Sequence, residues 1–140
     1  MRYRLYGLSV DTDRPLPGLS PVAPSGPADL RMWLGSVPPA VFPPAPEEPW
    51  YASPRMAVAE EPSLLAFRGV DGSFYRFLYA DGTELRVDAA GTRVACTWPA
   101  ALTLADAATY LLGSLCGFVL RLRGIPSLHA SAVALGDRSV

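Results

Sequence analysis

TLADAATYLLGSLCGFVLRLRGIPSLHASAVALGDRSV, residues 103–140, contains the start and stop signals of one long helix followed by a strand. Thr103 and Asp106 form a T-x-x-D pattern that is typical of a capping box, and the carboxylate favours the positive end of a helix dipole. Gly124 can end the helix in the left-handed conformation, and Pro126 prevents it from continuing. These signals predict one helix between the threonine and the glycine.

Apolar side chains cover most of the circumference of this predicted helix, residues 104–123. The helix is about long enough to span a membrane, so a small membrane-associated protein is one alternative. Asp106 in the first turn and an uninterrupted apolar run of about fourteen residues, short of the roughly twenty that a span needs, favour a buried helix. Gly113 and Gly117 form a G-x-x-x-G pattern, which we expect to let the helix pack closely on a sheet.

The segment LHASAVAL, residues 128–135, is predicted to be a buried strand. It holds His129, the only histidine of the chain, whose side chain titrates near neutral pH when unperturbed. By residue type alone, a single histidine in an apolar strand is more often a satisfied core residue than a catalytic one.

Residues 63–98 have the pattern of an antiparallel meander with one solvent-exposed face. Four apolar segments, LLAF, FYRFLY, ELRVD and RVACTW, alternate with turn signals at Asp71-Gly72, Asp81-Gly82 and Ala90-Gly91. Tyr75, Phe77 and Tyr79 form an aromatic stripe at strand spacing. Because no basic residues are interleaved in a way that suits nucleic acid, this stripe indicates packing in the core or on the sheet.

The N-terminal part is less regular. Residues 2–10 suit one strand with a bulge at Gly7, and residues 29–34 alternate as a second strand. Thirteen of the fifteen prolines lie between residues 15 and 62. Within this interval, residues 37–54 are predicted to form an extended loop on the surface, and the P-x-x-P pattern at 43–46 is more typical of a plain loop than of a docking motif.

Together these patterns predict an α+β fold: an antiparallel β meander with a proline-rich insertion, one long C-terminal helix and a terminal strand. The chain of 140 residues is long enough to bury one core, and its mean hydropathy is high for a freestanding domain. Some apolar surface is therefore expected to meet a partner or further chain.

Composition excludes several kinds of function. A net charge of −1 gives no electrostatic reason to expect binding to nucleic acid or to an anionic membrane. The chain has no lysine, so it can supply neither a Schiff base nor a phosphate-loop lysine. Cys96 and Cys116 fit no metal spacing and are expected to be reduced core residues. With no apolar N-terminal stretch long enough for a signal peptide, we expect a cytoplasmic protein.

Several segments resemble one known family. Residues 111–133, from LLG through RGIPSLHASAV, closely resemble the lead-in to the phosphate loop of the HPr serine kinase/phosphorylase-like proteins. The segments YRLYGL at 3–8 and LPGL at 16–19 are similar to the N-terminus of the bacterial HPr-kinase-related group, as are DGT at 81–83 and GTR at 91–93. The resemblance covers most of the chain and is most specific at the LHASAV strand.

The resemblance implies a site for ATP and magnesium in the complete family domain. There, the LHASAV-type strand is followed by a second strand and a G-x-x-x-x-G-K-[ST] loop that cradles the phosphates. Here, Gly136-Asp137 is similar to the intervening turn, and residues 138–140 to the start of the second strand. His129 matches the family histidine beside the bound phosphate and is therefore the catalytic candidate, whereas the adjacent Ser131 has no assigned role.

By this resemblance, residues 1–99 form a β-rich N-terminal domain with a proline-rich insertion at 35–62. Residues 100–140 are the helix and first strand of a truncated catalytic domain. We expect the N-terminal part of an ATP-dependent serine kinase acting on a protein or peptide, inactive by itself because the lysine and phosphate loop are missing. No ATP, magnesium or other metal is expected to bind these residues.

The alternative is a noncatalytic peptide- or protein-binding module, with the meander edge or the proline-rich loop receiving a peptide. A strand at 128–135 that is buried on both faces in a full domain would here expose an edge and apolar surface. We therefore also expect a marginally stable protein or a homo-oligomer.

Overall fold

The computed structural model describes residues 1–57, 60–127, 134–135 and 138–139, which form an α+β fold. The strands of the main sheet are β1 (Arg2–Leu5), β2 (Leu8–Thr12), β3 (Leu30–Leu34), β4 (Glu47–Ala52), β5 (Leu64–Gly69), β6 (Phe74–Tyr79), β7 (Glu84–Asp88) and β8 (Arg93–Thr97). The helical run consists of α1 (Leu104–Tyr110), the π turn η1 (Leu111–Leu115) and α2 (Cys116–Leu122). It is followed by a separate antiparallel pair, β9 (Ala134–Leu135) and β10 (Arg138–Ser139).

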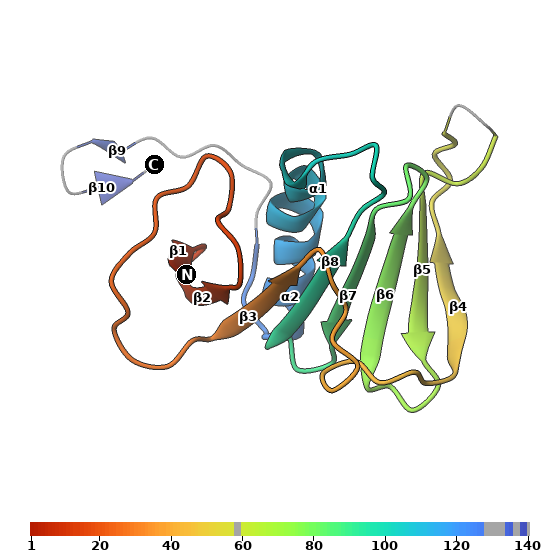
Figure 1. Ribbon diagram of the computed structural model, residues 1–140, viewed down its shortest axis with the longest axis horizontal. Coiled ribbons are helices and arrows are strands. Elements are labelled where there is room, and N and C mark those ends of the chain that lie inside the picture. Colours follow the sequence, from red (N-terminus) through yellow and green to blue (C-terminus); the bar gives the residue numbers. More distant parts are fainter. Residues whose placement is uncertain (58–59, 128–133, 136–137, 140) are drawn as a thin grey trace.

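Eight strands form one mixed sheet in the order β1-β2-β3-β8-β7-β6-β5-β4 (Figure 1). Each of β5 to β8 is antiparallel to the next, which confirms the predicted meander. The sheet is not antiparallel throughout, because β3 lies between β2 and β8 and is parallel to both. The long connection from β2 to β3 returns the chain to the same end of the sheet, as a parallel pair requires.

The first two strands form a hairpin, so the prediction of one bulged strand over residues 2–10 is wrong. β1 and β2 pair antiparallel, with Leu5 opposite Leu8. The two residues between them, Tyr6 and Gly7, have φ angles of 51° and 83°. Positive φ at both central positions is what a two-residue type I′ turn needs. The phase shift in the sequence comes from this turn.

Part of the proline-rich segment is a strand, so the prediction of a surface loop over residues 37–54 is wrong for β4. This strand pairs antiparallel with β5, and the register shifts between Pro49 and Tyr51. A proline is tolerated there because β4 is the edge strand, where a missing N–H need not cost a ladder bond. The bulge is a typical companion of an exposed edge.

The preceding residues of the segment cover the face of the sheet that lies away from the helix. Phe42 is buried and packs with Phe74 and Ala95. Ala95 lies between Val94 and Cys96 on β8, which both belong to the core on the other face, and side chains alternate along a strand. The proline-rich segment thus supplies a second, smaller apolar cluster.

The helical run packs on the sheet and shares the main core with it. Leu111, Leu115 and Val119 are buried together with strand residues such as Val87 and Val94. Within the part of the chain that the structure describes, Leu104–Leu122 is one helix whose length and apolar composition would allow it to cross a membrane. The buried stripe is what a core helix presents to a sheet.

The predicted capping box is confirmed. Asp106 N–H donates to the Thr103 hydroxyl oxygen at 3.3 Å, and Thr103 N–H donates to the Asp106 carboxylate at 2.8 Å. The side-chain hydrogen bond from Thr103 lowers the pKa of Asp106, because it favours the charged carboxylate. The predicted helix contains one feature without a sequence signal, the π turn, in which Cys116 N–H donates to Leu111 O.

Replacing Thr103 with alanine should lower the free energy of unfolding by about 1 kcal/mol, because Asp106 N–H loses its acceptor and the Asp106 carboxylate loses the hydrogen bond from the Thr103 hydroxyl. Urea denaturation followed by far-UV circular dichroism measures this. Thr109→Ala is the matched control, since Thr109 is exposed within the same helix and its hydroxyl donates only to Asp106 O. Equal losses for the two variants would contradict a capping role for Thr103.

Candidate functional site

The predicted catalytic segment begins directly after Ser127. His129 and Ser131 lie outside the described residues, so their surroundings remain a prediction. The structure does describe how the chain leaves the helix towards this segment. This helix exit, residues 120–127, is the candidate site.

The helix ends in a Schellman motif. Gly124 N–H donates to Arg121 O at 3.0 Å, and Ile125 N–H donates to Leu120 O at 2.9 Å. Gly124 has a φ of 71°, the left-handed conformation that this motif requires. The predicted stop at Gly124 is confirmed, and beyond Pro126 the chain lies beside the helix, with Ser127 Oγ 3.9 Å from a Cβ atom built at Gly117.

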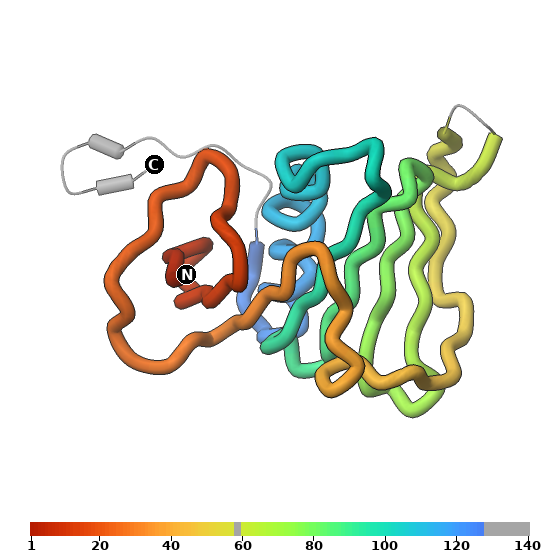
Figure 2. The backbone as a smooth tube through the Cα atoms, in the orientation of Figure 1, coloured from red at the N-terminus to blue at the C-terminus, as the bar shows by residue number. Residues whose placement is uncertain are grey.

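Arg123 fastens the helix exit to the sheet. Its Nη1 atom donates to Asp29 O at 3.1 Å and to Gly91 O at 3.4 Å, and its Nη2 lies 3.5 Å from Asp29 Oδ1. Asp29 precedes β3, and Gly91 lies in the turn between β7 and β8. The last turn of the helix is therefore held to two separate elements, and the backbone in Figure 2 passes beside them as it leaves.

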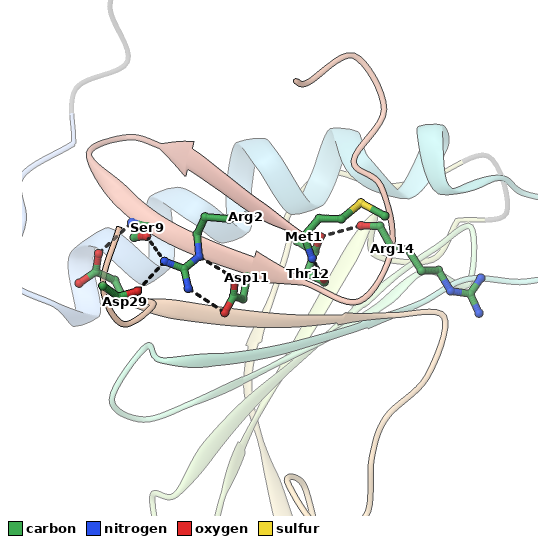
Figure 3. A network of polar contacts seen from close by, with 8 residues as sticks. Met1, Arg2, Ser9, Asp11, Thr12, Arg14 and Asp29 are labelled. Carbon is green, nitrogen blue, oxygen red and sulfur yellow. Dashed lines mark hydrogen bonds and ion pairs between the residues drawn. The ribbon is translucent and has the colours of Figure 1, made fainter. Parts of the chain in front are cut away.

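A polar network continues from Asp29 into the N-terminal hairpin (Figure 3). Ser9 N–H donates to Asp29 Oδ2 at 2.8 Å, and the Ser9 hydroxyl accepts from Arg2 Nη1 at 3.0 Å. Arg2 also binds both oxygens of Asp11, at 2.6 and 3.1 Å, which lowers the pKa of Asp11 chiefly through this hydrogen bonding. Because Arg2 is buried, its bidentate pairing fixes the hairpin in one orientation.

A groove of about 670 Å³ lies beside the helix exit and is lined in part by Tyr6, Gly113, Gly117 and Ser127. A Cβ atom added at Gly113 would meet nothing within 4 Å, and one at Gly117 would meet only Ser127 Oγ at 3.9 Å. The expectation that these glycines pack against the sheet is therefore wrong. They keep the outer face of the helix open, while leucines on the opposite side bind the sheet.

Tyr6 connects this groove to the π turn. Its hydroxyl donates to Leu112 O at 2.7 Å, across 106 positions of sequence. Tyr6 also holds a positive φ, a conformation that costs roughly 1–2 kcal/mol for a residue with a side chain. The tip of the hairpin and the middle of the helix thus support each other at the rim of the groove.

A second hollow, of about 490 Å³, lies on the other face between the proline-rich segment and the charged residues of β6 and β7. Its apolar wall includes Phe42 and Pro44, and its polar wall includes Glu47, Arg76 and Arg86.

The two arginines at this hollow, Arg76 and Arg86, differ in how many of their side-chain donors are paired. Arg76 binds Glu47 closely and contacts Glu84 at 3.3 Å. The pKa of Glu47 is lowered, first by the hydrogen bond from Arg76. Arg86 donates to Glu84 from Nε at 2.8 Å, whereas its two Nη atoms donate to no residue in the described ranges. Arg86 is therefore the cation with unused donors at this hollow.

The aromatic stripe of β6 is interior packing, as predicted. Tyr75 and Phe77 contact Phe118 of α2 edge-on, with ring centroids 5.1 and 5.0 Å apart. Tyr79 stacks on Tyr110 at 3.9 Å. These rings hold the helix on the sheet and leave no stacking platform for bases.

Both cysteines are free and buried, as predicted. Burial in apolar surroundings raises the pKa of each thiol to about 12, because the thiolate is disfavoured there. At neutral pH they are weak nucleophiles.

Clustered metal ligands and a phosphate-binding lysine are both absent from residues 1–57 and 60–127. Over residues 1–57 and 60–127, no three His, Cys, Asp or Glu side chains are grouped as metal ligands. The chain also has no lysine to neutralise phosphates. A phosphate-loop lysine would have to come from outside these 140 residues.

Comparisons with known proteins found no match to a family model, to a curated protein or to a solved structure. The resemblance to HPr-kinase-like proteins is therefore a prediction that rests on the quoted motifs.

Proposed function

We propose that this chain is the N-terminal part of an HPr-kinase-like, ATP-dependent kinase that acts on serine in a protein or peptide. The observation that carries the proposal is the element order at the C-terminal end. A capped helix ends at a Schellman motif, and the LHASAV segment with His129 follows within a few residues. In this proposal, residues 1–99 are a noncatalytic support, and residues 100–140 begin the catalytic domain.

In this proposal, the noncatalytic part serves to hold the helix exit in a fixed position. Phosphoryl transfer depends on positioning, so the strand that leads to a phosphate loop must start from a fixed point. Arg123 bonds that starting point to Asp29 and Gly91, and Asp29 is bonded in turn to the hairpin. In the complete family domain, ATP and magnesium would be held by groups beyond the described residues.

The DNA downstream of codon 140 tests the lineage. We expect a G-x-x-x-x-G-K-[ST] motif within about twenty codons in one of the frames. Its absence from all frames would remove the kinase proposal.

A noncatalytic peptide-binding module is the second candidate, favoured by the hollow beside Arg86. Apolar walls with a few polar groups are typical of ligand sites, and the free Nη donors suit a carboxylate. A short acetylated peptide of alternating leucine and aspartate is a suitable probe. It would lie between the proline-rich segment and the sheet.

Isothermal titration of the 140-residue chain separates the two candidates. The kinase proposal predicts that this chain does not bind magnesium–ATP. It does not depend on whether the chain binds the peptide probe. The module predicts peptide binding that Arg86→Met weakens roughly tenfold, the loss expected for one charged hydrogen bond. Arg68→Met is the control, because Arg68 lies on the other face and pairs with Glu48. Binding of magnesium–ATP by this chain would contradict both the kinase proposal and the peptide-binding proposal.

A further inference from the structure

We propose that the hollow beside Arg86 binds a small organic acid that carries a single carboxylate on an apolar group. The hollow measures about 490 Å³, within the range of cavities that hold drug-sized ligands. Its apolar wall comes from residues 37–45 of the proline-rich segment, and its charged side chains come from β4, β6 and β7. This ligand differs from the peptide of the second candidate function, so the two proposals succeed or fail separately.

The sheet register places two arginines side by side at the hollow. Arg76 of β6 lies directly opposite Arg86 of β7. Like charges in such a pair repel each other, so each guanidinium needs negative partners. Arg76 has them, because it binds Glu47 closely and contacts Glu84 at 3.3 Å. Its Cζ atom also lies 4.2 Å from the centroid of the Phe67 ring, so its guanidinium is already fully engaged within the sheet.

Arg86 is the arginine that can bind a ligand. Among the described residues, it donates only from Nε, to Glu84 at 2.8 Å, which leaves the donors of both Nη atoms unused. Its side chain is 25% exposed, so the guanidinium is partly withdrawn from water. The two Nη atoms form a fork that can donate to both oxygens of one carboxylate. A carboxylate is therefore the group that this side chain favours.

The charges around the hollow favour one carboxylate over several. Arg76 and Arg86 contact Glu47 and Glu84, so the two cations and the two anions balance. A first carboxylate would gain the unused donors of Arg86. A second would meet the two glutamates without a cation of its own, and like charges at close range repel each other. We therefore expect a ligand with a single negative charge.

The apolar wall suits a compact organic group better than a peptide backbone. Of its five residues, Pro39 and Pro44 have no N–H, and Phe42 donates its own to Pro38 O at 2.9 Å. The wall thus offers few donors to a peptide. The strands β6 and β7 are inner strands, so neither has an open edge with which a peptide could pair. Phe42 is buried in the smaller apolar cluster, which holds the wall in place.

Titration of the 140-residue chain with 3-phenylpropionate, followed by amide NMR spectra, tests the proposal. We expect a dissociation constant of about 0.1–1 mM, because so small a ligand gains little binding free energy in total. Shifts should appear at the amides of Val37, Ala45 and Arg86 but not at Gly113 and Gly117, which line the other groove.

The neutral analogue 3-phenylpropanamide is the matched control ligand. It should bind at least tenfold more weakly, because it lacks the charged oxygens that Arg86 would bind. Equal binding of the acid and the amide overturns the proposal, as does an absence of binding at about 10 mM acid. This comparison needs only the wild-type chain, so it does not depend on the folding of any variant.

Arg86→Met should weaken binding of 3-phenylpropionate about tenfold, the loss expected for one charged hydrogen bond. Arg68→Met should leave the affinity unchanged, since Arg68 lies on the other face of the sheet and pairs with Glu48. Circular dichroism melts establish that both variants fold. A folded Arg86→Met chain that binds the acid as tightly as wild type contradicts the proposal.

A tripeptide, N-acetyl-alanyl-alanyl-phenylalanine, separates a free acid from the end of a peptide chain. It should bind no more tightly than 3-phenylpropionate, because the hollow offers its backbone few partners. Affinity more than tenfold higher would assign the hollow to peptide ends and overturn the proposal. The leucine–aspartate probe distinguishes this inference from the peptide-binding module. If only that probe binds, the module stands and the inference fails; if only the small acid binds, the reverse holds.

Discussion

Replacing Leu111 with alanine should lower the free energy of unfolding by about 2–5 kcal/mol. Leu111 is fully buried in the core between the helix and the sheet, and it lies in the π turn. The truncated side chain would lose its apolar transfer energy and leave a cavity that the sheet closes only partly. Urea denaturation monitored by circular dichroism and tryptophan fluorescence gives the difference.

Leu112→Ala is the matched control for this loss, because Leu112 is the adjacent leucine but is only partly buried. It should cost less than half as much. Equal losses at the two positions would mean that the helix does not use this face to bind the sheet. A loss at Leu111 below about 1 kcal/mol would contradict its place in the core.

Replacing Asp88 with asparagine should lower the free energy of unfolding at neutral pH by roughly 1–3 kcal/mol. The buried carboxylate of Asp88 accepts from Thr92 N–H, the Thr92 hydroxyl, Arg93 N–H and Arg93 Nε at 2.7 to 3.0 Å. Burial raises its pKa, but the hydrogen bonds from Thr92 and Arg93 outweigh burial and leave the pKa lowered. The group is thus held charged in the turn between β7 and β8.

The sign of the pH dependence follows from this lowered pKa. A carboxylate whose pKa is lower in the folded state contributes its full stability above the unfolded pKa, near 3.9, and loses it as the pH falls through the folded value. The gap between wild type and Asp88→Asn should therefore be widest near neutral pH and narrow in acid. Glu61→Gln, at an exposed position, should show no such gap. A gap that does not change with pH would show that the charge of Asp88 is not involved.

The candidate site was only partly predictable. The capping box, the glycine stop and the LHASAV segment are local patterns, so the sequence indicates where the helix begins and ends and which histidine follows. The contact of Arg123 with Asp29 joins residues 94 positions apart, and no local pattern indicates it. The same is true of the hydrogen bond from Tyr6 to the π turn. The outward orientation of Gly113 and Gly117 depended on which face of the helix the sheet would take.

Local sequence signals were enough to predict the capped helix, the meander from β5 to β8 and the strand β3. Three features became visible only in the folded chain: residues 2–12 form a hairpin, β3 inserts between β2 and β8, and residues 47–52 form an edge strand despite Pro49. The difference lies in the range of the interactions. Caps and turns are satisfied by neighbouring residues, whereas strand order and the choice of buried face are fixed by hydrogen bonds and apolar contacts between distant parts of the chain.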